Sequence, residues 1–169
     1  MSMTFNPKKY HITKPIRLIE LFAGIGSQSK ALEKLGVNFV PWKVCEFDKY
    51  AVASYNAVHC TNFETSDVSK ISGADLEIVD TDKYEYIMTY SFPCVDLSLA
   101  GKRAGMDKDS GTRSSLLWQV ERLLTETKEL PQVLVMENVP QVHSASNMSA
   151  FQDWCKFLQD KGYSSYYKD

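Results

Sequence analysis

Short apolar runs alternate along the chain with longer segments whose apolar residues recur at helical spacing. The runs predict β-strands over four ranges: 16–22, 37–46, 84–90 and 132–136. The segments with helical spacing predict helices over four further ranges: 27–36, 49–59, 114–128 and 149–161. Strands that alternate with helices in this order are typical of an α/β domain, in which a mostly parallel sheet carries helices on both faces.

The pattern is weaker in three places. Pro41 makes the first half of the second strand irregular or places it at a sheet edge. Asn62 and Phe63 begin a possible short strand, which would put Asp67 near its carboxyl end, and the acidic stretch 73–82 indicates a solvated connection or a short helix. Residues 163–169 indicate the start of another strand.

A glycine turn follows the first strand. Gly24 and Gly26 lie between that strand and the helix that Ser27 can cap, as at the start of a nucleotide-binding βαβ unit. Ser29 stands where the dinucleotide fingerprint has a third glycine, so the pattern favours close approach of a ligand to the backbone over a pyrophosphate site. Glu46 ends the second strand 20 residues after Gly26, where a carboxylate can bind both ribose hydroxyls.

Glu46 and Asp67 each have a second interpretation. Glu46 could instead help Asp48 cap the next helix. Asp67 could accept a hydrogen bond from an adenine amine while Val68 packs on the ring, or it could simply be a turn aspartate.

Two reactive side chains follow two of the predicted strands. Pro93 and Cys94 end the strand at 84–90, where a thiol is a candidate nucleophile, although most free cysteines are small buried hydrophobic residues. Glu137 follows the strand at 132–136, where a half-buried carboxyl group could donate a proton or cap the next helix. Because the carboxyl ends of parallel strands share one edge, we expect Cys94 and Glu137 at the same edge.

A glycine-rich basic loop follows the cysteine, over residues 97–113. A loop of this length without apolar periodicity is typical of a lid or binding loop, and its basic side chains suit phosphate contacts, although a linker is the other interpretation. The candidate contact residues are Ser98, Lys102, Arg103 and Arg113.

Composition limits the classes of function. The 169 residues are 44% hydrophobic and 24% charged with a net charge of −2, as in a single ordinary globular domain and not a polyanion-binding body. Four cysteines without a CxxC pair, beside three histidines, show no zinc spacing, so we expect no metal. We find no signal-peptide pattern and no apolar run near 18 residues, which favours a reducing cytoplasm. Residues 1–15 are polar and are expected to form a flexible arm before a domain at 16–169.

Six motifs in this order and spacing resemble the DNA cytosine C5-methyltransferases. They are Leu21-Phe-Ala-Gly-Ile-Gly26, Cys45-Glu46, Asp67-Val68, Ser91-Phe-Pro-Cys-Val-Asp-Leu-Ser98, Ser110-Gly-Thr-Arg113 and Met136-Glu-Asn-Val139. Phe-Pro-Cys followed by Glu-Asn-Val is the most specific pair, and the resemblance runs from about Ile16 to the C-terminus. Val95 departs from the family, which usually has glutamine after the nucleophile.

The resemblance implies a Rossmann-like fold and methyl transfer from S-adenosylmethionine to C5 of a cytosine flipped out of double-stranded DNA. Cys94 would form the covalent adduct at C6, and Glu137 would hold the N3/N4 edge of the base. The implied cofactor-binding residues are Phe22, Gly24, Gly26, Glu46, Phe47, Asp67, Val68 and Pro93. The 97–113 loop would close over the flipped base.

The family's later elements have no counterpart in the sequence. They are a further strand, an Arg-rich motif, a target-recognition domain and a last helix, so we expect a partial catalytic domain that is incomplete at its C-terminal side. A second polypeptide could supply these parts, or the chain could be a truncated gene product; the third alternative is a remnant that serves as an inactive cofactor-binding or interaction module. The resemblance further implies a cytoplasmic protein of a prokaryote or phage, in the setting of restriction-modification.

Overall fold

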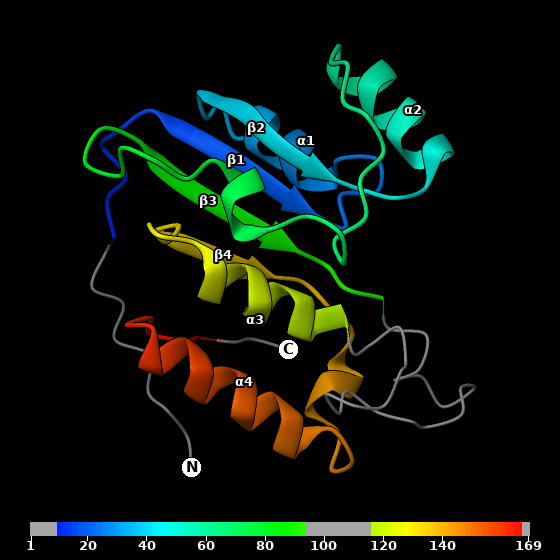
Figure 1. The fold of residues 1–169 in the computed structure, drawn as a ribbon. Coiled ribbons are helices and arrows are strands. Elements are labelled where there is room, and N and C mark those ends of the chain that lie inside the picture. Colours follow the sequence, from blue (N-terminus) through cyan, green and yellow to red (C-terminus); the bar gives the residue numbers. More distant parts are fainter. Residues whose placement is uncertain (1–9, 94–115, 167–169) are drawn as a thin grey trace.

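The computed structural model of the chain describes residues 10–93 and 116–166 (Figure 1). Its sheet has four parallel strands in the order β2-β1-β3-β4. The strands are β1 (Ile16–Leu21), β2 (Phe39–Cys45), β3 (Glu85–Tyr90) and β4 (Val133–Met136). All four correspond to predicted strands, so the parallel α/β sheet is confirmed.

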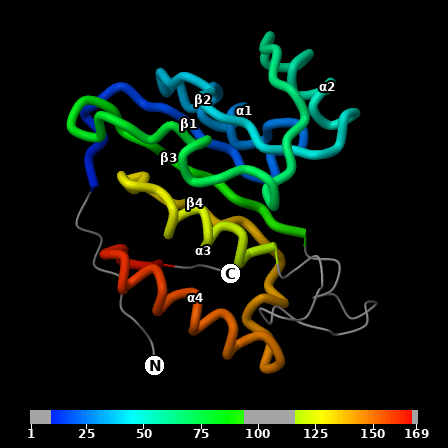
Figure 2. The backbone as a smooth tube through the Cα atoms, in the orientation of Figure 1, coloured from blue at the N-terminus to red at the C-terminus, as the bar shows by residue number. Residues whose placement is uncertain are grey.

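Helices lie on both faces of the sheet, as predicted. The α-helices are α1 (Ser27–Lys34), α2 (Lys49–His59), α3 (Leu117–Glu126) and α4 (Met148–Asp160). Among the described residues, the 3₁₀ helices η1 (Gly73–Leu76) and η3 (Pro140–His143) lie in the connections, so the acidic stretch 73–82 does contain a short helix. Figure 2 shows the connection from α2 to β3 running back along the sheet before the chain enters β3.

The alternation of side chains along β1 separates two cores. Ile19 and Leu21 point into the larger core, which α3 and α4 complete with Leu123 and Trp154. Leu18 points to the other face, where it joins a smaller cluster that includes Leu32 of α1. Figure 1 shows α3 in front of the sheet and α1 behind it.

Pro41 produces the irregularity that the sequence predicts. Leu18 pairs with Pro41 whereas Ile19 pairs with Lys43, so Trp42 is left without a partner in the register. The proline lacks an N–H to donate to the ladder, and β2 lies at an edge of the sheet, where that loss is tolerated.

Several predicted boundaries are wrong. Residues 61–66 and 163–166 form no strand. Ser27 is the first residue of α1 and not its cap, because Gly26 takes the N-cap position in a left-handed conformation. β4 is only half buried, with Val135 43% exposed, because it is the edge strand of the sheet in the described part of the chain.

Residues 10–15, the described part of the predicted arm, hydrogen-bond to the first residue of β3 and to the turn before it. Tyr10 donates from its hydroxyl to the buried carboxylate of Glu85. Lys14 donates to the carbonyl of Thr81 at 2.7 Å, and the Glu85 N–H donates to the Pro15 carbonyl at 3.0 Å. Residues 10–15 therefore follow the amino end of β3, while residues 1–9 lie outside the described residues.

Candidate active site

The four strands end in one row at the carboxyl edge of the sheet. Leu21 pairs with both Cys45 and Tyr90, and Tyr90 pairs with Met136. The residues that follow this row are Phe22, Glu46, Ser91 and Glu137. The four predicted motifs that contain Phe22, Glu46, Ser91 and Glu137 therefore leave the sheet at the same edge, as expected for parallel strands.

A topological switch point lies within this row. The chain moves from β1 outwards to β2, and then crosses back to place β3 on the other side of β1. Ligands of open α/β sheets bind in the crevice at such a point, outside the carboxyl ends of the strands. Gln28 of α1 lies at this point, because its Nε2 donates to the Ser91 hydroxyl after β3 at 3.1 Å.

The turn after β1 has an unusual backbone. Phe22, Gly24 and Gly26 all have positive φ, at 57°, 54° and 81°. A bulky residue such as Phe22 rarely takes this conformation, and such strain concentrates at ligand sites. The Gly26 N–H closes the turn by donating to the Ala23 carbonyl at 2.9 Å.

The two glycines of this turn have different surroundings. A Cβ on Gly26 would meet the His59 Nε2 atom at 2.3 Å and the Tyr55 ring at 2.6 Å. A Cβ on Gly24 would meet nothing within 4 Å. Gly26 thus permits close packing on α2, whereas Gly24 leaves open space at the edge of the sheet.

Glu46 is held against the glycine turn. Its Oε2 accepts from the Gly24 N–H and its Oε1 accepts from the Asp48 N–H, both at 2.9 Å. The helix-capping interpretation is therefore correct in part, since Asp48 itself caps α2 by accepting from Tyr50 at 2.7 Å. A carboxylate oxygen has two lone pairs, so each oxygen of Glu46 can still accept a bond from a ribose hydroxyl. Phe47 beside it is 78% exposed.

Asp67 adopts the turn conformation that was its second interpretation. Its Oδ1 accepts from the Ser69 hydroxyl at 2.7 Å and the Ser69 N–H at 3.0 Å, and these bonds lower the pKa of Asp67. The loop lies beside Glu46, because the Ser66 N–H donates to the Glu46 carbonyl at 2.8 Å. Val68 is 6% exposed and belongs to the core, so it supports the loop and offers little surface to a ring.

Glu137 begins the chain beyond β4. Its N–H donates to the Tyr90 carbonyl at 3.3 Å, which extends the pairing of β4 with β3. The side chain is exposed and not half buried as predicted, because β4 lies at the edge of the described sheet. Cys94 and the loop residues Ser98, Lys102, Arg103 and Arg113 lie outside the described residues.

Asn138 fastens the backbone that leads to Cys94, a role that sequence reasoning missed. Its Nδ2 donates to the Phe92 carbonyl at 2.9 Å, and its Oδ1 accepts from the Val139 N–H at 2.9 Å. The segments that follow β3 and β4 are thereby joined at Phe92, two residues before the predicted nucleophile.

A buried carboxylate beneath the glycine turn was also missed. Glu20 is 1% exposed, and it accepts from both the N–H and the hydroxyl of Ser29. The Tyr55 hydroxyl donates to the same carboxylate, and burial followed by this bond raises the pKa of Tyr55. An acidic residue inside an apolar strand and a serine in place of the third glycine were the available signals.

The residues at this edge fit an adenosyl cofactor. Glu46 offers acceptors for a diol, Phe47 offers an exposed ring, and Gly24 leaves room beside the backbone. In the described part of the chain, no group of three or more His, Cys, Asp or Glu side chains could hold a metal ion. None of the described helices is long and apolar enough to cross a membrane.

Comparison with known proteins agrees with this architecture. The sequence profile of the family described as C-5 cytosine-specific DNA methylase matches residues 16–168. The orphan methyltransferase M.SssI of Spiroplasma monobiae is 32% identical over 89% of this chain and 53% of its own length. The type II methyltransferase M2.ScrFI of Lactococcus lactis subsp. cremoris is 28% identical over 90% and 55%.

Solved structures share the fold. The Dnmt2 methyltransferase of S. pombe matches 88% of this chain and 40% of its own chain, with a TM-score of 0.65 and 22% identity. The Entamoeba histolytica methyltransferase EhMeth matches 90% and 46%, with a TM-score of 0.62 and 20% identity. These likenesses confirm the Rossmann-like fold.

The chain spans about half the length of the curated relatives it matches. The family match nevertheless covers almost all of the chain, from the start of β1 onwards. The chain therefore belongs to the C-5 cytosine-specific DNA methylase family.

Proposed function

We propose that this chain is the cofactor-binding and catalytic part of a DNA cytosine C5-methyltransferase. The observation that carries the proposal is the row of strand ends. It places the Phe22 turn, Glu46 and Glu137 at one edge of the sheet, where Asn138, just beyond β4, donates to the Phe92 carbonyl. Family membership supports the same reaction.

The methyl donor of the family is S-adenosylmethionine, which when bound supplies an electrophilic methyl group. Glu46 would bind the ribose hydroxyls, and Asp67 would accept from the adenine amine through its second oxygen. Phe22 and Phe47 would contact the adenosine, and Pro93 would border it. The backbone at Gly24 and Gly26 would lie beside the methionine part, where Gly24 leaves space.

Cys94 would begin the chemistry on the target base. Its thiolate adds to C6 of cytosine, and the electron pair of the C5–C6 double bond makes C5 nucleophilic. C5 would then take the methyl group, with S-adenosylhomocysteine as the leaving group. A general base would remove the C5 proton, and the C5–H electron pair would restore the double bond as the bond from C6 to Cys94 breaks and the thiolate leaves. Glu137 would hold the N3/N4 edge and protonate N3, which draws electrons from C6. Because the Glu137 side chain is exposed, the flipped cytosine could approach it from outside the edge of the sheet.

The substrate would be double-stranded DNA with the target cytosine outside the helix, because a base within the stack cannot reach a thiol in a pocket. Ser98, Lys102, Arg103 and Arg113 would contact the phosphates. Because the relatives are about twice as long, we further propose that activity needs the remaining part of the family domain, from a further segment or a second polypeptide.

Methyl transfer from labelled S-adenosylmethionine to cytosine-containing DNA tests the proposal. The chain would be assayed alone and with a polypeptide that carries the later elements of a relative such as M.SssI. We expect transfer in the mixture and none with Cys94→Ala, whereas Cys60→Ala, an exposed cysteine on the C-terminal side of α2, should remain active. A duplex with 5-fluorocytosine should form a covalent adduct that Cys94→Ala abolishes.

Two outcomes would count against it. Methylation that persists in Cys94→Ala would exclude the thiol mechanism. Cofactor binding without transfer or adduct, in any mixture, would favour the alternative of an inactive cofactor-binding module.

A further inference from the structure

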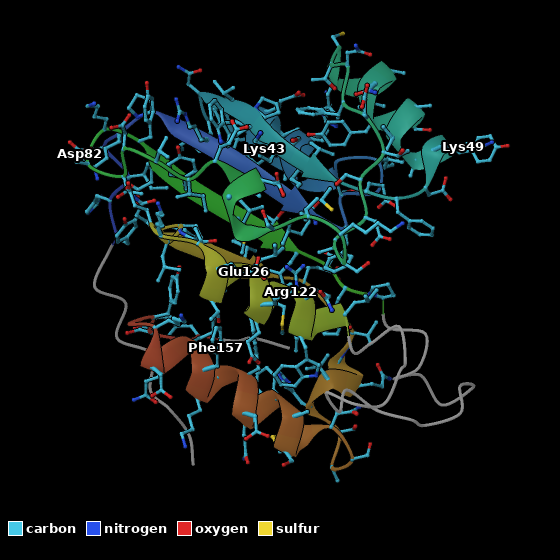
Figure 3. The ribbon with its side chains drawn as sticks, in the orientation of Figure 1. Lys43, Lys49, Asp82, Arg122, Glu126 and Phe157 are labelled. Carbon is cyan, nitrogen blue, oxygen red and sulfur yellow. The ribbon has the colours of Figure 1, made fainter. Side chains whose placement is uncertain are left out.

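We infer that Arg122 and Glu126 of α3 form a positioning unit that holds the Asp67 loop in shape for an adenine ring. The inference rests on the proposed function, since it assigns to the Asp67 loop the adenosine end of the cofactor. Neither residue belongs to a sequence motif. Figure 3 labels both on α3, on the side that faces the connection carrying η1.

Arg122 binds the backbone of the loop directly. Its Nη2 donates to the Val68 and Ile71 carbonyls, at 2.9 Å each. These two carbonyls belong to the turn that follows Asp67, in which the Lys70 N–H also donates back to the Asp67 carbonyl at 2.9 Å. One guanidinium group thus closes the loop from the side of α3.

Glu126 completes the unit. Its two oxygens accept from Arg122 Nη1 at 2.9 and 3.0 Å, and Oε2 also accepts from the Gly73 N–H at 2.8 Å. A Cβ on Gly73 would meet the Thr127 nitrogen at 2.7 Å, so the loop ends directly against the last turn of α3. The ion pair therefore contacts the loop on both sides of Ser72.

The other side of the loop is fastened to the second strand. The Ser66 N–H donates to the Glu46 carbonyl, and the Ser66 hydroxyl donates to the Cys45 sulfur at 3.1 Å. Asp67 and Val68 are thus held between the end of β2 and α3. A loop fixed at both ends before ligand binding loses less conformational entropy when the ligand arrives, which increases affinity.

A purely structural ion pair would also stabilise the chain, so stability alone does not identify a positioning role. The distinguishing property is selectivity for the adenine amine. If Arg122 positions Asp67, loss of Arg122 should weaken the binding of an adenosine compound more than that of the matching inosine compound, which lacks the amine.

The experiment measures dissociation constants of the full chain for S-adenosylhomocysteine and S-inosylhomocysteine by titration calorimetry. For Arg122→Gln we expect about tenfold weaker binding of S-adenosylhomocysteine, as for loss of one hydrogen bond to a charged group. Binding of S-inosylhomocysteine should change less, so that the preference between the two falls. Arg122→Lys should lie between, because one ammonium group cannot reproduce the fork of donors.

The control is Lys83→Gln, which removes the exposed ion pair with Asp80 in the turn before β3. It should leave both dissociation constants unchanged. If Arg122→Gln weakens both ligands equally, or neither, the pair does not position the loop for adenine and the inference is overturned.

Amide hydrogen exchange of residues 66–73 without ligand separates this inference from the proposed function. Faster exchange in Arg122→Gln supports the positioning unit, and unchanged exchange overturns it, whatever the ligand data show. If the unaltered chain binds neither compound, the cofactor assignment fails, and with it the adenine role of the unit.

Discussion

Ser29 shows how one residue can replace a glycine of a binding fingerprint without loss of close packing. A glycine at this position would let α1 approach the sheet, whereas Ser29 is fully buried and bonds to the carboxylate of Glu20. Tyr55 of α2 donates to the same carboxylate, so β1, α1 and α2 meet at one buried charge. A buried carboxylate is tolerated only with such partners.

Ser29→Ala tests this connection. The variant removes one donor from Glu20, and a hydrogen bond lost from a buried charged group costs about 1–3 kcal/mol of unfolding free energy. Urea unfolding measures the change. Ser54→Ala is the matched control, because its exposed hydroxyl bonds only to the Tyr50 carbonyl of its own helix, and it should change stability by less than about 0.5 kcal/mol. Equal losses of unfolding free energy in Ser29→Ala and Ser54→Ala would show that the bond from Ser29 to Glu20 does not stabilise the fold.

The Tyr55→Phe variant should lose stability by an amount that depends on pH. At pH 8 we expect it to be about 1–2 kcal/mol less stable than the unaltered chain, because Glu20 loses a donor. The native pKa of Tyr55 is raised above its usual value of about 10, so the contribution of its hydroxyl is complete below pH 10 and falls as pH rises further. The stability difference should therefore narrow between about pH 10 and pH 11, as denaturant unfolding at both values would show. A stability difference that stays the same between pH 10 and pH 11 would contradict the role given to the Tyr55 hydroxyl.

The two glycines of the turn provide a paired prediction. Gly26→Ala should destabilise the chain strongly, because its Cβ would overlap His59 and Tyr55. Gly24→Ala should cost only about 1–2 kcal/mol, the strain of a left-handed alanine, because the space around it is open. Filling that space should nevertheless weaken S-adenosylmethionine binding, measured by titration calorimetry. Unchanged affinity in Gly24→Ala would place the cofactor elsewhere.

At the scale of elements, α3 stabilises the fold through the buried residues of one face. Leu123 is fully buried within the larger core, whereas Leu35, just after α1, is 75% exposed. Leu123→Ala should therefore lower the unfolding free energy by about 2–5 kcal/mol, and Leu35→Ala by far less. Chemical denaturation of both variants measures the difference, and similar losses would contradict the packing.

The elements that the sequence predicted best are those in which the spacing of apolar residues matches the buried face. β1, β3, α2 and α3 all follow their apolar pattern to within a few residues of the prediction. The predicted strand at Asn62 and Phe63 failed because a side chain replaces the strand partner. Asn56 accepts from the Phe63 N–H and donates to its carbonyl, at 2.9 Å each.

The residues of the candidate site also differ in how far the sequence predicts them. Glu46 and Glu137 were predictable, because a residue that follows a parallel strand must lie at the carboxyl edge. Glu20, Arg122 and Asn138 were not, because their partners are brought close only by the fold, at Ser29, the Asp67 loop and Phe92. The exposure of Glu137 also depends on which strand lies at the edge of the described sheet, which periodicity does not indicate.

At the scale of the whole molecule, the site joins segments that are distant in sequence. The glycine turn, Glu46 and Ser91 are held together by the Gly24–Glu46 and Gln28–Ser91 hydrogen bonds. A ligand that contacts all three segments should stabilise the entire fold, because it binds only the native arrangement.

S-adenosylhomocysteine at 100 times its dissociation constant should raise the unfolding free energy by about 2.7 kcal/mol and increase the melting temperature. Differential scanning calorimetry measures the shift. Gly24→Ala at the same ligand concentration should show a smaller increase. An equal increase in the variant would show that the ligand stabilises the chain from another site.

The paired row of strand ends has a consequence for how the reactive groups are spaced. Glu137 comes one residue after the row, while three residues, Ser91, Phe92 and Pro93, separate the row from Cys94, the proposed nucleophile. Phe92 is 2% exposed and belongs to the larger core, so the packing of the core as well as the length of this tripeptide would set where the proposed nucleophile lies. A family member in which the tripeptide is longer or shorter would therefore have to repack Phe92 and replace its bond to Asn138 to keep both the fold and methyl transfer.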